Sequence, residues 1–175
     1  MEEISLYVYH NIDNERIPAY VSEATQEDFE KTMDWQTKWT SRAVKKMPNK
    51  VALRRTDNEE LLGLMSYEEQ DGNFAVEIIY LENAAHSNAN LLHMRNEEKK
   101  YIGIARALFA YAIKVSLDDG YGGVLFFRAK SDKHVEYYSK NFGARTLGRY
   151  DPYRMAIWEE AAMEIISDYW KGETL

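Results

Sequence analysis

The sequence has 175 residues, 45% of them hydrophobic, which suits one globular domain with a sizeable core. Its 22 basic and 29 acidic residues give a net charge of −7, so we expect neither nucleic acid nor an anionic membrane as a partner. The lack of cysteine excludes disulfides, a thiolate nucleophile and a cysteine-based zinc site. No apolar run could span a bilayer, and the acidic start Met1-Glu2-Glu3 does not resemble a secretory signal, so we expect a cytoplasmic protein.

The first part of the chain predicts a strand, a helical region and then a sheet. Apolar and polar residues alternate over Ile4–Tyr9, as in a half-buried strand. Thr25-Gln26-Glu27-Asp28 has the form of a capping box, so a long helical region is expected to start there and to run, with a break, to Met47. The next three segments are separated by turn signals and predict an antiparallel meander: Val51–Arg54, Leu61–Tyr67 and Phe74–Glu82.

The second part of the chain alternates helices with strands. A long polar connection, Asn83–Lys99, leads to a helix from Gly103 to about Asp119, which Gly120 ends. The remaining elements are expected at Gly123–Ala129 (strand), Lys133–Asn141 (helix, ending near Gly143), Ala144–Arg149 with Arg154–Trp158 (hairpin) and Glu159–Lys171 (helix). This order of elements predicts a mixed α/β sheet flanked by helices.

The most informative stretch opens the helix that follows the polar connection: Lys100-Tyr101-Ile102-Gly103-Ile104-Ala105-Arg106. The first N–H groups of a helix have no acceptor within it, and the positive end of the helix dipole favours an anion. Gly103 has no Cβ and Ala105 has the smallest side chain that carries one, so a ligand could approach the backbone closely there. The stretch therefore predicts a pyrophosphate site for a phosphate-bearing cofactor, with an ordinary loop-to-helix junction as the alternative.

Two motifs and the order of elements resemble the GCN5-related N-acetyltransferase (GNAT) superfamily. The family's acetyl-CoA signature, Gln/Arg-x-x-Gly-x-Gly/Ala, is similar to the stretch from Lys100 to Ala105, with lysine replacing Gln/Arg. Tyr137-Tyr138-Ser139-Lys140-Asn141-Phe142-Gly143-Ala144 is similar to the family's aromatic-Tyr-x-Lys-x-Gly-Phe ending, with one additional residue before the glycine and alanine replacing phenylalanine. The resemblance covers about 51–158, and we expect residues 1–175 to form a single GNAT-type domain.

The resemblance implies a sheet whose two central parallel strands part to admit acetyl-CoA. The pantetheine arm would pair with the main chain of the strand at Phe74–Glu82, near Ile79, Tyr80 and Leu81. Ser131, His134 and Tyr137 would also contact the cofactor, although a helix N-cap or a solvent-facing position is the alternative for Ser131 and His134. Acetyl-CoA is the expected cosubstrate, and the sequence offers no cluster of ligands for a metal.

Acetyl transfer to an amine needs a base for the amine and an acid for the departing thiolate. By resemblance, Glu77 in the central strand is one candidate base, and a surface glutamate is the alternative reading. Glu82, at the end of the same strand and close to His86, is the second candidate. Tyr138 occupies the position of the family's usual general acid, and Tyr137 is the alternative because of the additional residue before Gly143.

The resemblance, together with these residues, implies an acyl-CoA-dependent N-acetyltransferase that moves an acetyl group to a primary amine by direct attack in a ternary complex. The alternative is a GNAT-fold protein that binds CoA as a sensor, or serves as an interaction module, without efficient catalysis. The acceptor would be a small molecule or a peptide, and the acidic composition favours a cationic amine. The resemblance also suggests a homodimer, because dimers are common in this fold.

Overall fold

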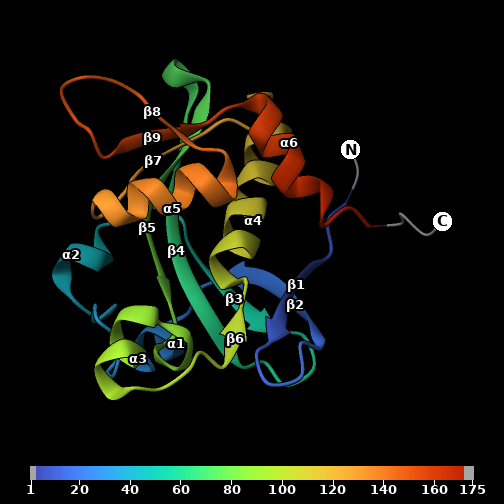
Figure 1. Cartoon of the computed structure of the whole chain (residues 1–175), viewed down its shortest axis with the longest axis vertical. Coiled ribbons are helices and arrows are strands. Elements are labelled where there is room, and N and C mark those ends of the chain that lie inside the picture. Colours follow the sequence, from blue (N-terminus) through green and yellow to red (C-terminus); the bar gives the residue numbers. More distant parts are fainter. Residues whose placement is uncertain (1–2, 172–175) are drawn as a thin grey trace. The chain divides into compact units, whose positions relative to one another are not determined.

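The computed structural model describes residues 3–171, so Met1 and Glu2 of the acidic start lie outside the described residues (Figure 1). Contacts divide the chain into two compact units. The first unit contains the described residues up to Ile4, Tyr67–Ile79, and the chain from Phe109 onward. The second unit contains Ser5–Ser66 and Tyr80–Leu108. No helix in residues 3–171 combines the length and the hydropathy that a membrane crossing requires.

The strands belong to one mixed sheet, as the predicted fold class requires. Their bounds are β1 Leu6–His10, β2 Arg16–Glu23, β3 Lys50–Arg55, β4 Leu61–Gln70, β5 Ala75–Asn83, β6 Tyr101–Ile102, β7 Leu125–Arg128, β8 Arg145–Thr146 and β9 Arg154–Ile157. Neighbouring strands follow the order β6-β1-β2-β3-β4-β5-β7-β9-β8. The pair β5 and β7 is parallel, whereas β3 and β4, and β7 and β9, are antiparallel.

Six α-helices lie within the described residues, at α1 Gln26–Glu30, α2 Arg42–Lys45, α3 Ala89–Arg95, α4 Ile104–Asp118, α5 Asp132–Phe142 and α6 Glu159–Ser167. Short 3₁₀ turns occupy Asp71–Asn73 and Ala85–Ser87. The predicted helix after Gly103 and the predicted helix that stops at Gly143 are confirmed. Gly143 adopts the left-handed conformation and caps α5.

The expectation of a long helical region from Thr25 to Met47 is wrong, because α1 and α2 are both short. The capping box itself is confirmed, since the Asp28 N–H donates to the Thr25 side chain and the Thr25 N–H donates to Asp28 at 2.7 Å. Beyond Glu30, the N–H groups of Lys31, Thr32 and Trp35 donate to carbonyls three residues earlier, as in turns, and side chains accept other N–H groups. The Trp39 N–H donates to the Thr32 hydroxyl at 3.0 Å, for example, which holds the chain in turns.

Sequence patterns missed three elements of the second unit. Strand β2 contains Pro18, which cannot donate to a ladder, but its carbonyl accepts the Thr56 N–H at 3.0 Å. Helix α3 lies in the polar connection expected at Asn83–Lys99, and strand β6 lies in the stretch after it that was expected to open a helix. The side chain of Asn88 caps α3 by accepting the N–H groups of Asn90 and Leu91, so a polar stretch supplies its own helix start.

Each unit has its own buried core. In the second unit, two tryptophans pack with aliphatic side chains, and the members are Trp35, Trp39, Val44, Ala52, Leu61, Leu64, Ala84 and Ala85. In the first unit, four aromatic rings pack together, those of Phe109, Phe127, Tyr138 and Phe142. The core of the first unit thus packs Phe127 of β7 against Tyr138 of α5.

The second unit also contains a buried ion pair between Asp28 and Arg54. Arg54 Nη1 donates to Asp28 Oδ1 at 2.6 Å, and Nη2 donates to Oδ2. Burial by itself raises the pKa of Asp28. The hydrogen bonds from Arg54 and from the Thr25 N–H lower the pKa, and together the lowering effects outweigh burial, so the pKa lies below its ordinary value. The folded state therefore holds Asp28 as a carboxylate.

We predict that Asp28→Asn lowers the free energy of unfolding by about 3 to 5 kcal/mol at pH 7, because it leaves the Arg54 charge buried without its partner. The folded pKa of Asp28 is below the unfolded one, so this contribution is full above the unfolded pKa and disappears as the pH falls through the folded pKa. Urea denaturation at several pH values measures the difference. Glu27→Gln, at an exposed neighbour, is the control and should change stability by less than about 1 kcal/mol; an equal effect of the two variants would contradict the prediction.

Candidate functional site

In the second unit, the predicted phosphate loop lies between β6 and α4. Gly103 has a φ of +94°, and a Cβ built there would meet no atom within 4 Å. The Ala107 N–H donates to the Gly103 carbonyl at 3.0 Å, so helical hydrogen bonding begins at this glycine. The N–H groups of Ile104 and Ala105 precede this bond, at the positive end of a fifteen-residue helix. This helix end can receive an anion.

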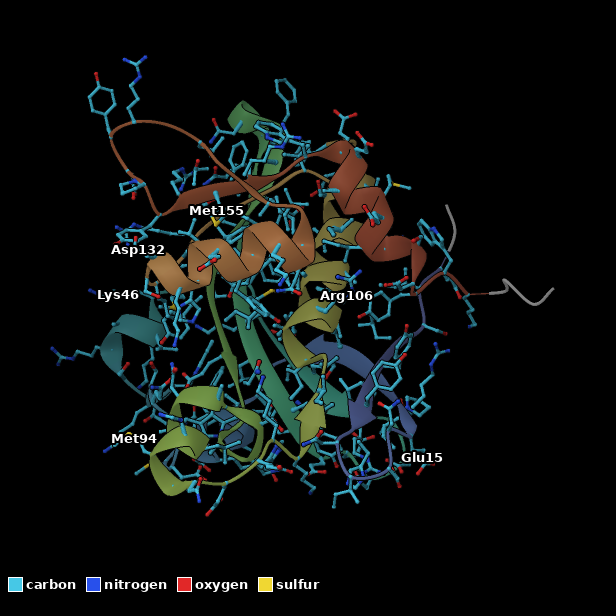
Figure 2. The ribbon with its side chains drawn as sticks, viewed as in Figure 1. Glu15, Lys46, Met94, Arg106, Asp132 and Met155 are labelled. Atoms are coloured by element: carbon cyan, nitrogen blue, oxygen red, sulfur yellow. The ribbon has the colours of Figure 1, made fainter. Side chains whose placement is uncertain are left out.

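The side chains of Lys100 and Tyr101 bind to other residues of the second unit. Lys100 Nζ donates to Glu60 Oε2 at 2.7 Å, and the Tyr101 hydroxyl donates to Glu60 Oε1. Arg55 Nη1 donates to the Tyr101 hydroxyl at 2.7 Å, and only 1% of Tyr101 is exposed. Ile102 is exposed, and Arg106 lies on the first turn of α4 (Figure 2). Because Lys100 is paired with Glu60, the main chain at Gly103 is the part of this loop that is available to bind an anion.

Glu82 is almost fully buried and binds three donors of the second unit. Its Oε2 accepts the N–H groups of Gln36 at 2.9 Å and of Thr37 at 3.3 Å, and its Oε1 accepts the Trp39 indole N–H at 3.2 Å. Nearby, the hydroxyls of Tyr80 and Thr37 are 2.6 Å apart. Glu82 thus anchors the segment between α1 and α2 to the end of β5.

A cavity of about 430 Å³ also lies in the second unit. It is lined by Lys31, Asp34, Trp35, Asn58, Glu59, Glu60, Leu61, Ala84, Ala85 and His86. Burial lowers the pKa of His86, which opposes its charging at neutral pH. Its Nδ1 is 2.7 Å from the Ser87 hydroxyl, and its Nε2 is 3.3 Å from the Leu61 carbonyl, so both ring nitrogens have partners.

In the first unit, the parallel ladder between β5 and β7 is short. It joins Val76 with Leu125 and Glu77 with Phe126 and, among the residues that the structure describes, does not continue to Phe127 although β7 does. Ile79, farther along this interior strand, is 38% exposed. An edge of β5 therefore opens within the sheet, and the amides of an extended ligand could pair with it as an added strand would.

Glu77 lies at the last step of this ladder. Arg154 Nη1 donates to Glu77 Oε1 at 2.7 Å, and Nη2 donates to Oε2 at 3.3 Å. The Glu77 side chain is 14% exposed, so it is neither a freely solvated surface group nor completely enclosed. Its register partner Phe126 places it on one face of the sheet, and the next β7 residue, Phe127, points to the other face.

Tyr138 belongs to α5, which packs against the Phe127 face. Its ring centroid is 5.0 Å from that of Phe127 and 5.7 Å from that of Phe109. Burial raises the pKa of Tyr138 to about 12, so its phenol stays protonated at neutral pH. Tyr137 is 49% exposed. Of the two candidate acids, Tyr138 is thus the one with a fixed ring.

Ser131 and His134 lie at the start of α5 in the first unit, close to Asp132 in Figure 2. The Ser131 hydroxyl caps the helix by accepting the His134 N–H at 3.3 Å, and it is 2.8 Å from His134 Nδ1. Burial, and then the positive charges of Lys130 and Lys133, lower the pKa of His134. The N-cap that the sequence left as an alternative for Ser131 is present.

The structure thus brings Glu77, Tyr138, Ser131 and His134 into one unit, with Glu77 and Tyr138 on opposite faces of the sheet. Sequence reasoning missed Arg154, the partner of Glu77. The alternation around Arg154 could assign its side chain to a face of β9 but could not show that β5 presents a carboxylate to that face. In residues 3–171, no three His, Asp or Glu side chains gather closely enough to hold a metal ion.

No protein-family model matches the sequence, and no curated protein is similar enough in sequence to be identified as a relative. Solved structures resemble it in fold. A mutant of the toxin AtaT, bound to the C-terminus of the antitoxin AtaR and to acetyl-CoA, is 15% identical with a TM-score of 0.54 over 85% of this chain and 98% of that chain. A GNAT family acetyltransferase from Listeria monocytogenes is 11% identical with a TM-score of 0.55, over 87% of this chain and 99% of that chain.

A third similar structure corrects one of our expectations. The AtaT–AtaR complex bound to DNA is 17% identical, with a TM-score of 0.57 over 83% of this chain and 98% of that chain. Because proteins of this fold occur in complexes that contain DNA, the expectation that nucleic acid is excluded as a partner was wrong. The net charge describes the whole surface and not a local patch, and it does not include the charge of a partner protein. It therefore cannot support such an exclusion.

At these identities the likeness shows the fold and no more. The nine-stranded mixed sheet, the short parallel ladder and the helix that starts after Gly103 agree with it. The chain has the fold of the GCN5-related N-acetyltransferases, as the motifs around Gly103 and Tyr138 predicted.

Proposed function

We propose that the chain is a single N-acetyltransferase domain that transfers an acetyl group from acetyl-CoA to a primary amine by direct attack. The observation that carries the proposal is the end of the parallel ladder after Glu77 and Phe126, because it opens an edge of β5 within the sheet. The similar fold of a toxin with bound acetyl-CoA supports the choice of cosubstrate.

Two parts of the chain suit the cofactor. In the second unit, the N–H groups that follow Gly103 would bind the pyrophosphate, since the open space at Gly103 lets a ligand reach the main chain. Along β5, the main chain at Ile79, Tyr80 and Leu81 would bind the amides of the pantetheine arm. Ser131, His134 and Tyr137 would lie near the cofactor at α5, with Ser131 also capping that helix.

In the reaction, the amine nitrogen attacks the thioester carbonyl, the C–N bond forms and the C–S bond breaks. We assign the base to Glu77, acting directly or through water, because only one of its oxygens is held at a short distance by Arg154. Glu82 is the weaker choice, since three donors already bind it. Tyr138 would donate a proton to the departing thiolate and recover one from solvent.

The second candidate function is a CoA-binding sensor without efficient catalysis. It is favoured by the partners of the two carboxylates, because Arg154 binds Glu77 and three N–H donors bind Glu82. Binding of acetyl-CoA with no thiol release for any amine would support the sensor. Thiol release with an amine would support the enzyme.

Gly103→Glu should abolish binding of acetyl-CoA in a calorimetric titration, because the new carboxylate would repel the phosphates at the helix end. The open space around Gly103 means that the side chain causes no steric clash within the protein. Gly103→Ala is the matched control, since it brings the same backbone strain without a charge, and it should weaken binding far less. Equal affinities of the Glu variant and the wild type would move the phosphate site elsewhere.

Tyr138→Phe should lower kcat by about 100-fold while leaving the affinity for acetyl-CoA unchanged, because it removes only the proton donor from a packed ring. Steady-state kinetics and a separate titration measure the two quantities. Tyr137→Phe is the control at the exposed neighbour and should leave kcat unchanged. A larger loss in the Tyr137 variant would exchange the roles of the two tyrosines.

Glu77→Gln should lower kcat/KM by about 100-fold and lower the melting temperature less than Glu82→Gln does, since the Arg154 side chain is 35% exposed and can be solvated when it loses its charged partner. Glu82→Gln should act mainly on stability, costing about 1 to 3 kcal/mol, because an amide cannot accept all three N–H groups. Thermal unfolding and thiol-release kinetics on both variants separate the effects. If Glu82→Gln loses turnover while remaining fully folded, the base is Glu82.

A further inference from the structure

Three arginines in the first unit share the face of the sheet on which Glu77 lies. Glu77 on β5 is opposite Phe126 on β7, Phe126 is opposite Ala156 on β9, and Ala156 is opposite Arg145 on β8. Residues opposite one another in a sheet point to the same face, so Glu77 and Arg145 lie at two ends of one row.

The adjacent row adds two more guanidinium groups. Arg128 is opposite Arg154, and Arg128 lies two residues after Phe126, so both side chains share the face of Phe126. The contacts agree with this register, since the Arg154 guanidinium is 5.6 Å from the centroid of the Phe126 ring and binds Glu77. We call Arg128, Arg145 and Arg154 the arginine face.

Solvent reaches the arginine face. The Arg128 side chain is 59% exposed, the Arg154 side chain is 35% exposed, and Arg145 is an exposed residue. Trp158, 44% exposed, packs edge-on against Phe126 at 5.8 Å and supplies an apolar surface between the charges. The other face of β7 is covered instead, because Phe127 packs against Tyr138 of α5.

The charge of this face is opposite to that of the chain. Two of the three guanidiniums bind a carboxylate. Arg154 donates to Glu77, and Arg128 Nε donates to Asp151 at 3.0 Å. The chain as a whole carries a net charge of −7. A planar guanidinium binds a carboxylate or a phosphate through two parallel N–H bonds, which are stronger than its bonds to a neutral acceptor.

We propose that the amine acceptor carries an anionic group, a carboxylate or a phosphate, which Arg145 and Arg128 bind while the amine lies at Glu77. This inference rests on the proposed function and reverses the cationic acceptor that the composition favoured. Three strand spacings separate β5 from β8, about 14 Å at the usual spacing, and the long arginine side chain covers part of that span. A short aliphatic chain between the amine and the anion fits the rest, lying over Phe126 and Trp158.

The test compares matched amines in a thiol-release assay with acetyl-CoA. The pair 6-aminohexanoate and 6-aminohexanamide differs in a carboxylate, and the pair O-phosphoethanolamine and ethanolamine differs in a phosphate. We expect kcat/KM to be about tenfold higher, or more, for the anionic member of at least one pair, as one charge-assisted contact allows. The pair with the larger ratio identifies which anion the protein selects.

Arg145→Gln and Arg128→Gln should each remove most of this preference by raising KM for the anionic amine, with kcat nearly unchanged. Lys140→Gln is the matched control, because it removes one positive charge from an exposed position of α5 in the same unit. It should leave the preference intact. A general electrostatic effect would lower the preference equally in all three variants and would overturn the inference.

A calorimetric titration with 6-aminohexanoate and with O-phosphoethanolamine, without acetyl-CoA, separates this inference from the proposed function. Saturable binding that Arg145→Gln abolishes, with no turnover of any amine, would support the anion site and overturn the acetyltransferase. Turnover without preference for either anionic amine would overturn the anion site and leave the acetyltransferase. Neither binding nor turnover would overturn both.

Discussion

The arrangement of the first unit depends on where the parallel pairing of β5 and β7 stops. The ladder joins Val76 with Leu125 and Glu77 with Phe126 and does not extend to Phe127. Because β7 continues in its antiparallel ladder with β9, the strand stays fixed on that side while its β5 side opens. Glu77 is the last residue of β5 that pairs with β7. The next β7 residue, Phe127, packs against Tyr138. The opening therefore has a carboxylate on one face of the sheet and a phenol on the other.

The two carboxylates of β5, Glu77 and Glu82, differ in their hydrogen-bond partners and in their burial. Glu82 is 3% exposed and accepts two main-chain N–H groups and one indole N–H, so its side chain ties down the connection between α1 and α2. Such a buried acceptor is costly to leave without its donors, which suits an anchor. Glu77 has a single arginine partner and partial exposure, so a water or an amine can approach it. The two glutamates of β5 therefore differ in their number of hydrogen-bond donors and in their exposure to solvent.

Local patterns predicted the elements that local physics determines. The capping box at Thr25, the helix after Gly103 and the left-handed cap at Gly143 each depend on neighbouring residues, and each is present. The capping signal at Thr25 predicted a long helical region that runs, with a break, to Met47. Glu82, far away in sequence, instead accepts the N–H groups of Gln36 and Thr37 in this region. For the same reason, no pattern around Arg154 could show that it binds Glu77, since that pair depends on the register of three strands.

The net charge of the chain differs from the local charge on one face of its sheet. The excess of acidic residues suggested a cationic acceptor and the exclusion of nucleic acid, and both conclusions treated the charge as evenly spread. Strand alternation instead sends Arg128, Arg145 and Arg154 to one face, because each lies at a register position on the side of Phe126. Screening limits surface charges to about 8 to 10 Å at physiological salt, so acidic groups elsewhere on the chain have little effect on a ligand at this face. The proposed anion site therefore rests on the local arrangement of these guanidiniums and not on the total of −7.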